Sequence, residues 1–278
     1  MNLDVVVFSI ITGSVSGLAF WAASNAISKV VANSGQISIS LYGKLLESGK
    51  KEFLQENLIR TFYFSIPLVA MAITYAKPGL FTLNPIYEVA SNIVIIMSVV
   101  IFLRTLDGIF DSALTGIEKV DVKEDSSFKD YIKSKLFYIP TIRLIHRSVY
   151  LVSVSSILLI LTFFSFSDVD LITYWALISL ITQIPFSAYF YKLVKNNFEL
   201  KIDKIPILKY LFAATITFGL AYFLMQEYLV YKESIFEFLP GFLPFVIIGI
   251  GGYLGLTYLI DSKIRDLAKL VIREFIKK

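Results

Sequence analysis

Seven mostly apolar stretches of about twenty residues recur along this chain, and each is long enough to cross the hydrocarbon core of a membrane. They lie at about 5–31, 60–77, 88–110, 148–167, 169–191, 208–228 and 238–260. The 278-residue chain is 56% hydrophobic and 17% charged, whereas a soluble domain is about half apolar and a quarter charged. A soluble core does not present its apolar residues as repeated uncharged blocks of this length. We therefore predict an all-α, polytopic transmembrane helix bundle of about seven spans, forming a single domain over 1–278.

The first span is the most polar of the seven, with serine and threonine residues distributed along it. This composition favours a helix buried among other helices over one that faces lipid. A signal peptide is the alternative interpretation. However, residues 1–4 carry no basic n-region and no clear cleavage site follows, so we expect a retained helix.

Lysine and arginine residues predict the orientation, because cytoplasmic loops are enriched in them. Four lie in 34–60, seven in 118–147, five in 192–209 and six from 261 onward, whereas the intervening loops hold only Lys77 and Lys232. Seven spans with a cytoplasmic C-terminus place the N-terminus outside. The charges sort by side of the membrane, so the net charge of +4 does not indicate a nucleic-acid partner. We expect a multi-pass protein of the cell (cytoplasmic) membrane.

The residues after the last span, 261–278, are predicted to form a cytoplasmic amphipathic tail. Ile264, Leu267, Val271 and Phe275 share one helical face, and basic residues flank it. Such a helix lies on anionic lipid or, alternatively, docks a soluble partner. Near other span ends, tyrosines and Trp175 are expected to anchor the protein at headgroup level.

The third span contains three charged residues, Arg104, Asp107 and Asp111, spaced so that they share one helical face. A charge at membrane depth costs about 2.5 kcal/mol or more, so it normally faces a bundle interior or a wet cavity. Three interpretations remain open: a functional cavity lining, a structural Arg–Asp pair, or, for Asp111, a solvated position near the cytoplasmic interface. Arg104 is a candidate substrate ligand, and Asp107 and Asp111 are candidate ion-coupling residues.

Other polar residues near the spans have simpler interpretations. Arg60 begins the second span, where it either reaches back to the membrane boundary or binds substrate. Gln183 lies alone within a span and is expected to form an interhelical hydrogen bond. His146 precedes the fourth span and is expected to be solvated.

Several classes of chemistry lack support in this sequence. It contains no cysteine and one histidine, His146, which excludes disulfides and a histidine-cluster metal site. Neither G-x-x-x-x-G-K-[ST] nor H-E-x-x-H occurs. We expect a protein without enzymatic activity, with no catalytic residues, no metal and no cofactor.

Five segments carry a resemblance to a known family: Ser40–Lys44, Lys50–Phe53, Arg60–Leu68, Ala113–Lys119 and Tyr253–Lys278. Together they look like the connector, helix ends and tail of the C-terminal part of polysaccharide and lipid-linked oligosaccharide flippases. These belong to the multidrug/oligosaccharidyl-lipid/polysaccharide exporter superfamily. The likeness is one of pattern along essentially the whole chain.

The resemblance implies a fold and a substrate. Family members have about twelve or more helices in two lobes around a central cavity, so the seven spans would be one lobe plus one helix. The other lobe is lacking, which implies a truncated chain or a split transporter with a second chain as partner. In the family, cavity arginines engage the pyrophosphate of the lipid carrier. Here Arg104 and Arg60 are the candidates, because a planar guanidinium suits phosphate.

Three functions follow as hypotheses. The first is a flippase that moves a lipid-linked oligosaccharide or polysaccharide precursor across the membrane by alternating access, with membrane lipids and the lipid-linked glycan as its partners. The second is a cation-coupled exporter of small molecules of the multidrug type, with Asp107 or Asp111 as the ion site. The third is a non-transporting scaffold whose basic loops, 118–147 above all, dock glycosyltransferases.

Overall fold

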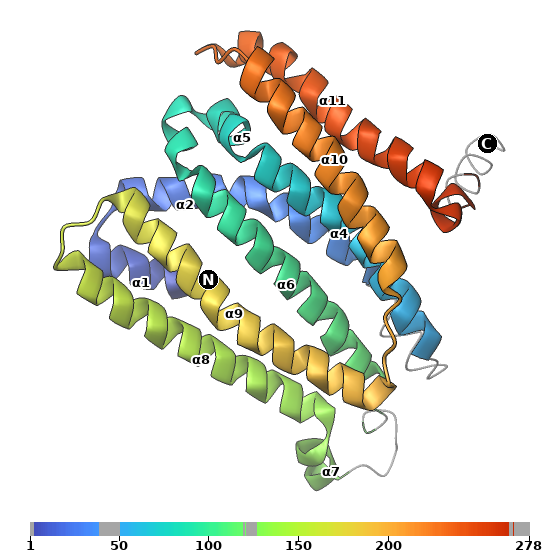
Figure 1. Cartoon of the computed structure of the whole chain (residues 1–278). Helices are drawn as coiled ribbons and strands as arrows, with labels where there is room; N and C mark the ends of the chain where they lie inside the picture. The colour runs from blue at the N-terminus through green and yellow to red at the C-terminus, as the bar shows by residue number, and fades with distance from the viewer. Residues whose placement is uncertain (1–2, 39–50, 119, 121–126, 267–268, 270–278) are drawn as a thin grey trace.

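The structure is a computed structural model that describes residues 3–38, 51–118, 120, 127–266 and 269. All regular elements within these ranges are helices (Figure 1). In chain order they are α1 (Leu3–Thr12), α2 (Val15–Ser28), η1 (Lys29–Ser38), α4 (Lys51–Thr74), α5 (Ala76–Leu83), η2 (Pro85–Ala90), α6 (Ser91–Gly116), α7 (Phe128–Lys133), α8 (Lys135–Thr162), α9 (Asp168–Phe198), α10 (Lys204–Tyr228) and α11 (Ile235–Ile260). Over the described residues, seven segments are long and apolar enough to span a membrane, which confirms the all-α transmembrane bundle.

The first predicted span, 5–31, is wrong as one continuous helix. Gly13 adopts a left-handed conformation with φ of +64°, and its N–H donates to the carbonyl of Ser9 at 3.0 Å, which ends α1. Ser14 then caps α2 by accepting a hydrogen bond from the N–H of Gly17 at 2.8 Å. The spanning segment is Val15–Gln36, and α1 is a short separate helix that packs along α8.

Several other helices start earlier or end later than the apolar runs predicted for them. α4 already begins at Lys51, α6 continues to Gly116, and α8 begins at Lys135. The extension of α8 places His146 well inside a helix, where its ring stacks on Phe186 with centroids 4.1 Å apart. The expectation of a solvated His146 is therefore wrong. In α6 and α8 the extensions contain polar residues with partners on the neighbouring helix, since Asp111 pairs with Arg143.

The helices form two groups, visible in Figure 1. α4, α10 and α11 pack together around a core that contains Tyr63, Tyr210, Phe218 and Tyr253. α1, α2, α6, α8 and α9 form the second group, in which α6 and α9 make the most extensive contact between any two described elements. α4 also packs against η1 and α6 and so joins the two groups.

A proline in α4 is compensated by a side chain from α11. Pro67 has no N–H, so the carbonyl of Tyr63 one turn earlier loses its normal helical donor. The hydroxyl of Tyr253 donates to that carbonyl at 2.7 Å. Tyr253 is 2% exposed, so this bond lies inside the bundle. Irregular backbone at membrane depth requires such a partner, because lipid offers none.

The basic connections leave one end of the bundle. α6 and α9 end, and α4, α8 and α10 begin, toward the lower right of Figure 1. This arrangement is what the charge pattern requires. The sidedness itself, with the N-terminus outside and the C-terminus cytoplasmic, stays a prediction. Most of the amphipathic tail predicted at 261–278 lies outside the described residues, which include a helical stretch at 262–266.

Candidate functional site

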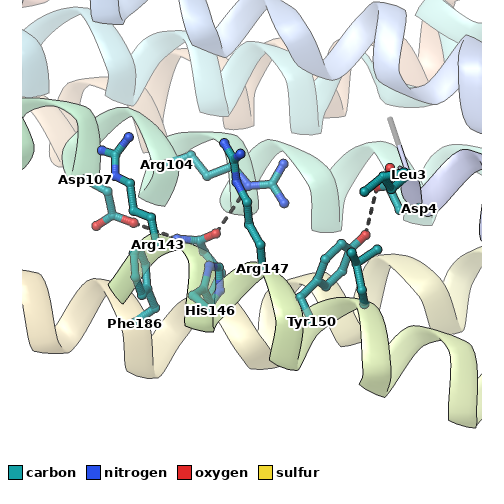
Figure 2. Close-up of a pocket in the computed structure, with 11 residues that line it drawn as sticks. Leu3, Asp4, Arg104, Asp107, Arg143, His146, Arg147, Tyr150 and Phe186 are labelled. Carbon is teal, nitrogen blue, oxygen red and sulfur yellow. Dashed lines mark hydrogen bonds between the residues drawn. The ribbon is translucent and has the colours of Figure 1, made fainter. Parts of the chain in front are cut away.

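A cavity of about 570 Å³ lies between α6, α8, α9 and the start of α1. Figure 2 shows Arg104 extending from α6, and Arg143, His146 and Arg147 extending from α8, into the same space. The charged and titratable side chains that line the cavity, apart from Tyr150, are Asp4, Arg104, Asp107, Arg143, His146 and Arg147. Arg104 lies near the middle of α6, which belongs to one of the seven segments long and apolar enough to span a membrane.

Asp107 is held by two side chains of α9. One of its carboxylate oxygens, Oδ2, accepts hydrogen bonds from Gln183 Nε2 at 2.6 Å and from Ser187 Oγ at 2.8 Å. Gln183 Oε1 in turn accepts a bond from Arg104 Nε at 3.2 Å. Gln183 therefore joins Arg104 to Asp107, which confirms its predicted interhelical hydrogen bond. Asp107 is only 3% exposed, and its second oxygen, Oδ1, accepts no hydrogen bond from the described residues.

Asp111 has a different partner. Its Oδ2 forms an ion pair with Arg143 of α8, with an N···O distance of 2.7 Å. The three charged residues of α6 thus lie on one face as predicted, but the structure divides them. Arg104 and Asp107 line the cavity, whereas Asp111 pairs with Arg143 at its edge. Within the described residues, Arg104 pairs with neither aspartate inside 4 Å. The local Arg–Asp pair, one of the three interpretations, is therefore replaced by a bridge through Gln183.

Two arginines of the cavity, Arg104 and Arg147, form no ion pair within the described part of the chain. Arg147 was not among the predicted site residues, because the apolar run of the fourth span begins after it. A signal was nevertheless present in the sequence. Arg143, Arg147 and Tyr150 are spaced by four and three residues, which places them on one face of α8.

The start of α1 closes one side of the cavity through Tyr150. The Tyr150 hydroxyl donates to Asp4 Oδ2 at 3.0 Å and accepts from Trp175 Nε1 at 2.7 Å and from Ser179 Oγ at 3.2 Å. The Trp175 ring stacks on Trp21 of α2, with centroids 3.8 Å apart. Trp175 is fully buried, so its predicted role as an anchor at headgroup level is wrong. Its N–H has a partner inside the bundle.

Arg60, the other predicted substrate ligand, lies elsewhere. It is on α4, its side chain is 54% exposed, and it pairs with Glu56 one turn earlier on the same helix. It does not line the cavity that contains Arg104. The structure therefore does not bring the two candidate arginines together. The boundary position weighed for Arg60 fits this exposure.

The arrangement can bind an anion. Guanidinium groups present several N–H donors in a plane, a geometry that matches phosphate and carboxylate oxygens. Within the described ranges, no three histidine, aspartate or glutamate side chains gather in a way that could hold a metal ion. The cavity therefore offers cationic donors, the carboxylates of Asp107 and Asp4, and the hydroxyl of Tyr150, which already donates to Asp4.

Comparison of the chain with protein-family models, with curated proteins and with solved structures finds no match to any of them.

Proposed function

We propose that this chain is a transporter of the cytoplasmic membrane that moves a phosphate-bearing, lipid-linked oligosaccharide or polysaccharide precursor across the bilayer by alternating access. The observation that carries the proposal is the presence of Arg104 and Arg147 in a cavity at membrane depth without an ion-pair partner in the described structure. The pattern resemblance to polysaccharide flippases supports the same substrate. In this proposal a second chain, or a lobe that precedes the present sequence, supplies the remaining helices.

The energetic argument favours an anionic ligand. Each arginine at the centre of a membrane helix costs about 2.5–3.5 kcal/mol on insertion scales. A chain retains such residues when they face water or a partner, and when they serve a function. Asp111 already neutralises Arg143, at 2.7 Å. A diphosphate group would supply negative charge and acceptor oxygens to Arg104 and Arg147, while its lipid tail remained in the bilayer.

The test replaces these arginines in cells that depend on the chain. Deletion of the gene should abolish surface glycan and trap lipid-linked oligosaccharide on the cytoplasmic leaflet, and the unchanged gene should restore both. Arg104→Ala and Arg147→Ala should each fail to restore them at normal membrane abundance. Arg60→Ala is the matched control, because Arg60 lies outside the cavity, and it should restore both.

Two results would count against this function. If deletion leaves surface glycan unchanged, the substrate class is wrong. If Arg104→Ala and Arg147→Ala both restore flipping, the cavity is not the binding site, and the scaffold hypothesis gains support. The scaffold hypothesis requires effects from 118–147, and residues 119 and 121–126 of that segment lie outside the described residues.

A second candidate function is cation-coupled export. Asp107 favours it, because a carboxylate that is 3% exposed keeps one oxygen without a hydrogen bond from the described residues. A proton or Na⁺ bound at that oxygen would compensate the buried charge. Coupling predicts that an imposed pH or Na⁺ gradient drives transport in the original chain and not in Asp107→Asn. Transport that does not depend on either gradient would exclude cation coupling.

A further inference from the structure

A second, apolar cavity of about 470 Å³ lies between α4 and α10, with Phe102 of α6 also in its lining, and it shares no lining residue with the arginine cavity. It is a trough between two helices that run in the same direction (Figure 1). The α4 residues that line it are at positions 62, 66, 69, 70, 73 and 74. The α10 residues are at positions 207, 211, 214, 215, 218 and 219. The lining positions have the same spacing on the two helices, so each helix presents one continuous face to the trough.

The length of the trough matches one leaflet. Twelve residues separate Phe62 from Thr74, which is about 18 Å of helix at about 1.5 Å per residue. The hydrocarbon core of a bilayer is about 30 Å thick, so one leaflet contributes about 15 Å. A trough of this length accommodates the extended chain of one lipid.

A glycine keeps the trough open. Gly219 lies on its α10 wall, and a Cβ added at this position would meet no atom within 4 Å. The residues beside it, Ala214 and Thr215, are also small. A larger side chain at position 219 would therefore enter the trough without disturbing the packing of the helices.

The trough continues into a polar pocket at the end of the bundle opposite the basic connections. Ile73 and Thr74 line both cavities. The polar pocket, of about 270 Å³, is also lined by Lys77, Ser91 and Gln226. Gln226 lies two turns beyond Gly219 on the same face of α10, so the two cavities form one groove with an apolar part and a polar end.

The polar end offers a cation and unused donors. Lys77 Nζ lies 3.8 Å from Glu88 Oε2 and 5.4 Å from the centre of the Tyr231 ring. An ion pair of this length between partly exposed groups is weak. The side chains of Ser91 and Gln226 form no hydrogen bond with the described residues, so they are free to donate to a headgroup.

We propose that this groove binds one chain of an anionic phospholipid from the leaflet opposite the basic connections, with the headgroup phosphate on Lys77. The apolar faces of α4 and α10 hold the chain, and Lys77, Ser91 and Gln226 hold the phosphate. The site is separate from the arginine cavity. Its occupancy does not depend on whether the chain transports a lipid-linked saccharide.

The test is native mass spectrometry of the full chain, purified in detergent and mixed with equal amounts of phosphatidylglycerol and phosphatidylcholine of identical chains. Both lipids carry a phosphate, but the quaternary ammonium of phosphatidylcholine cancels its charge and is repelled by Lys77. The original chain should therefore retain one phosphatidylglycerol with a preference of about tenfold. Lys77→Gln should reduce this preference to about one. Lys232→Gln is the matched control and should leave it unchanged, because Lys232 pairs with Glu237 at 3.5 Å outside the groove.

A second pair of variants tests the apolar part. Gly219→Leu should reduce the retention of both lipids about tenfold. Gly251→Leu, at a glycine of α11 that is equally open and lies outside the groove, should not change retention. Equal retention of the two lipids by the original chain would overturn the headgroup assignment. Unchanged retention in Gly219→Leu, with a melting temperature like that of Gly251→Leu, would overturn the groove itself.

Discussion

The hydroxyl of Tyr253 should stabilise the bundle mainly because Pro67 interrupts the backbone of α4. The Tyr253 hydroxyl donates to the Tyr63 carbonyl at 2.7 Å, and that carbonyl lacks its helical donor because Pro67 has no N–H. Tyr253→Phe keeps the ring, which is 2% exposed, and removes the hydroxyl alone. The variant therefore isolates one hydrogen bond between α11 and α4.

The magnitude follows from what the carbonyl loses. A buried acceptor left without a partner costs about 1–3 kcal/mol, whereas hydrogen bonds between membrane helices average about 0.6 kcal/mol. The Tyr63 carbonyl has no second donor in its own helix, so we expect Tyr253→Phe to lower the free energy of unfolding by about 1–2 kcal/mol. In Pro67→Ala, the new N–H at position 67 can bond the same carbonyl. The cost of Tyr253→Phe should then fall to about 0.5 kcal/mol, a coupling of about 1 kcal/mol.

The assay is unfolding of the full chain in mixed micelles by increasing dodecyl sulfate, followed by far-ultraviolet circular dichroism. The four proteins of the cycle are the original chain, Tyr253→Phe, Pro67→Ala and the double variant. Tyr258→Phe serves as the control, because Tyr258 lies on the same helix and is 38% exposed. If Tyr253→Phe lowers the free energy of unfolding equally in the original chain and in Pro67→Ala, the reasoning is refuted. The loss would then not come from the unpaired Tyr63 carbonyl.

The remaining predictions use the same unfolding assay. Gly249→Ala should lower the free energy of unfolding by about 1–3 kcal/mol through overpacking, because its Cβ would be too close to the Tyr75 hydroxyl. Gly251→Ala, at an open position, should not lower it. Equal losses in the two variants would contradict the packing argument. Tyr150→Phe should cost about 1–3 kcal/mol, because the N–H of fully buried Trp175 loses its acceptor at 2.7 Å. A loss below about 0.5 kcal/mol would mean that another acceptor replaces the hydroxyl.

The transmembrane bundle was predictable because the length and polarity of a span are local properties. An apolar run of about twenty residues has few alternatives to a membrane helix, and all seven runs correspond to spanning helices in the structure. The boundaries were less predictable. α8 begins at Lys135 although its apolar run begins at 148, because its arginines face a cavity built by other helices.

The candidate site was predictable in part. Arg104 and Asp107 were identified because charges within an apolar run are conspicuous and their spacing puts them on one face. Arg143 and Arg147 were missed, because outside the apolar run they resemble ordinary loop residues. Arg60 was included on its chemistry alone, and the structure places it on an exposed face beside Glu56.

The sequence by itself determined the helical class, the positions of the spans and the end of the bundle to which the basic residues belong, because hydrophobic length and charge act residue by residue. Only the tertiary structure decided which charges pair. Arg143 pairs with Asp111, and Gln183 bridges Arg104 and Asp107. The tertiary structure also decided that the Tyr253 hydroxyl donates to the backbone carbonyl that Pro67 leaves without a donor. These choices depend on which helices become neighbours, and residues far apart in the chain meet only once the bundle has formed.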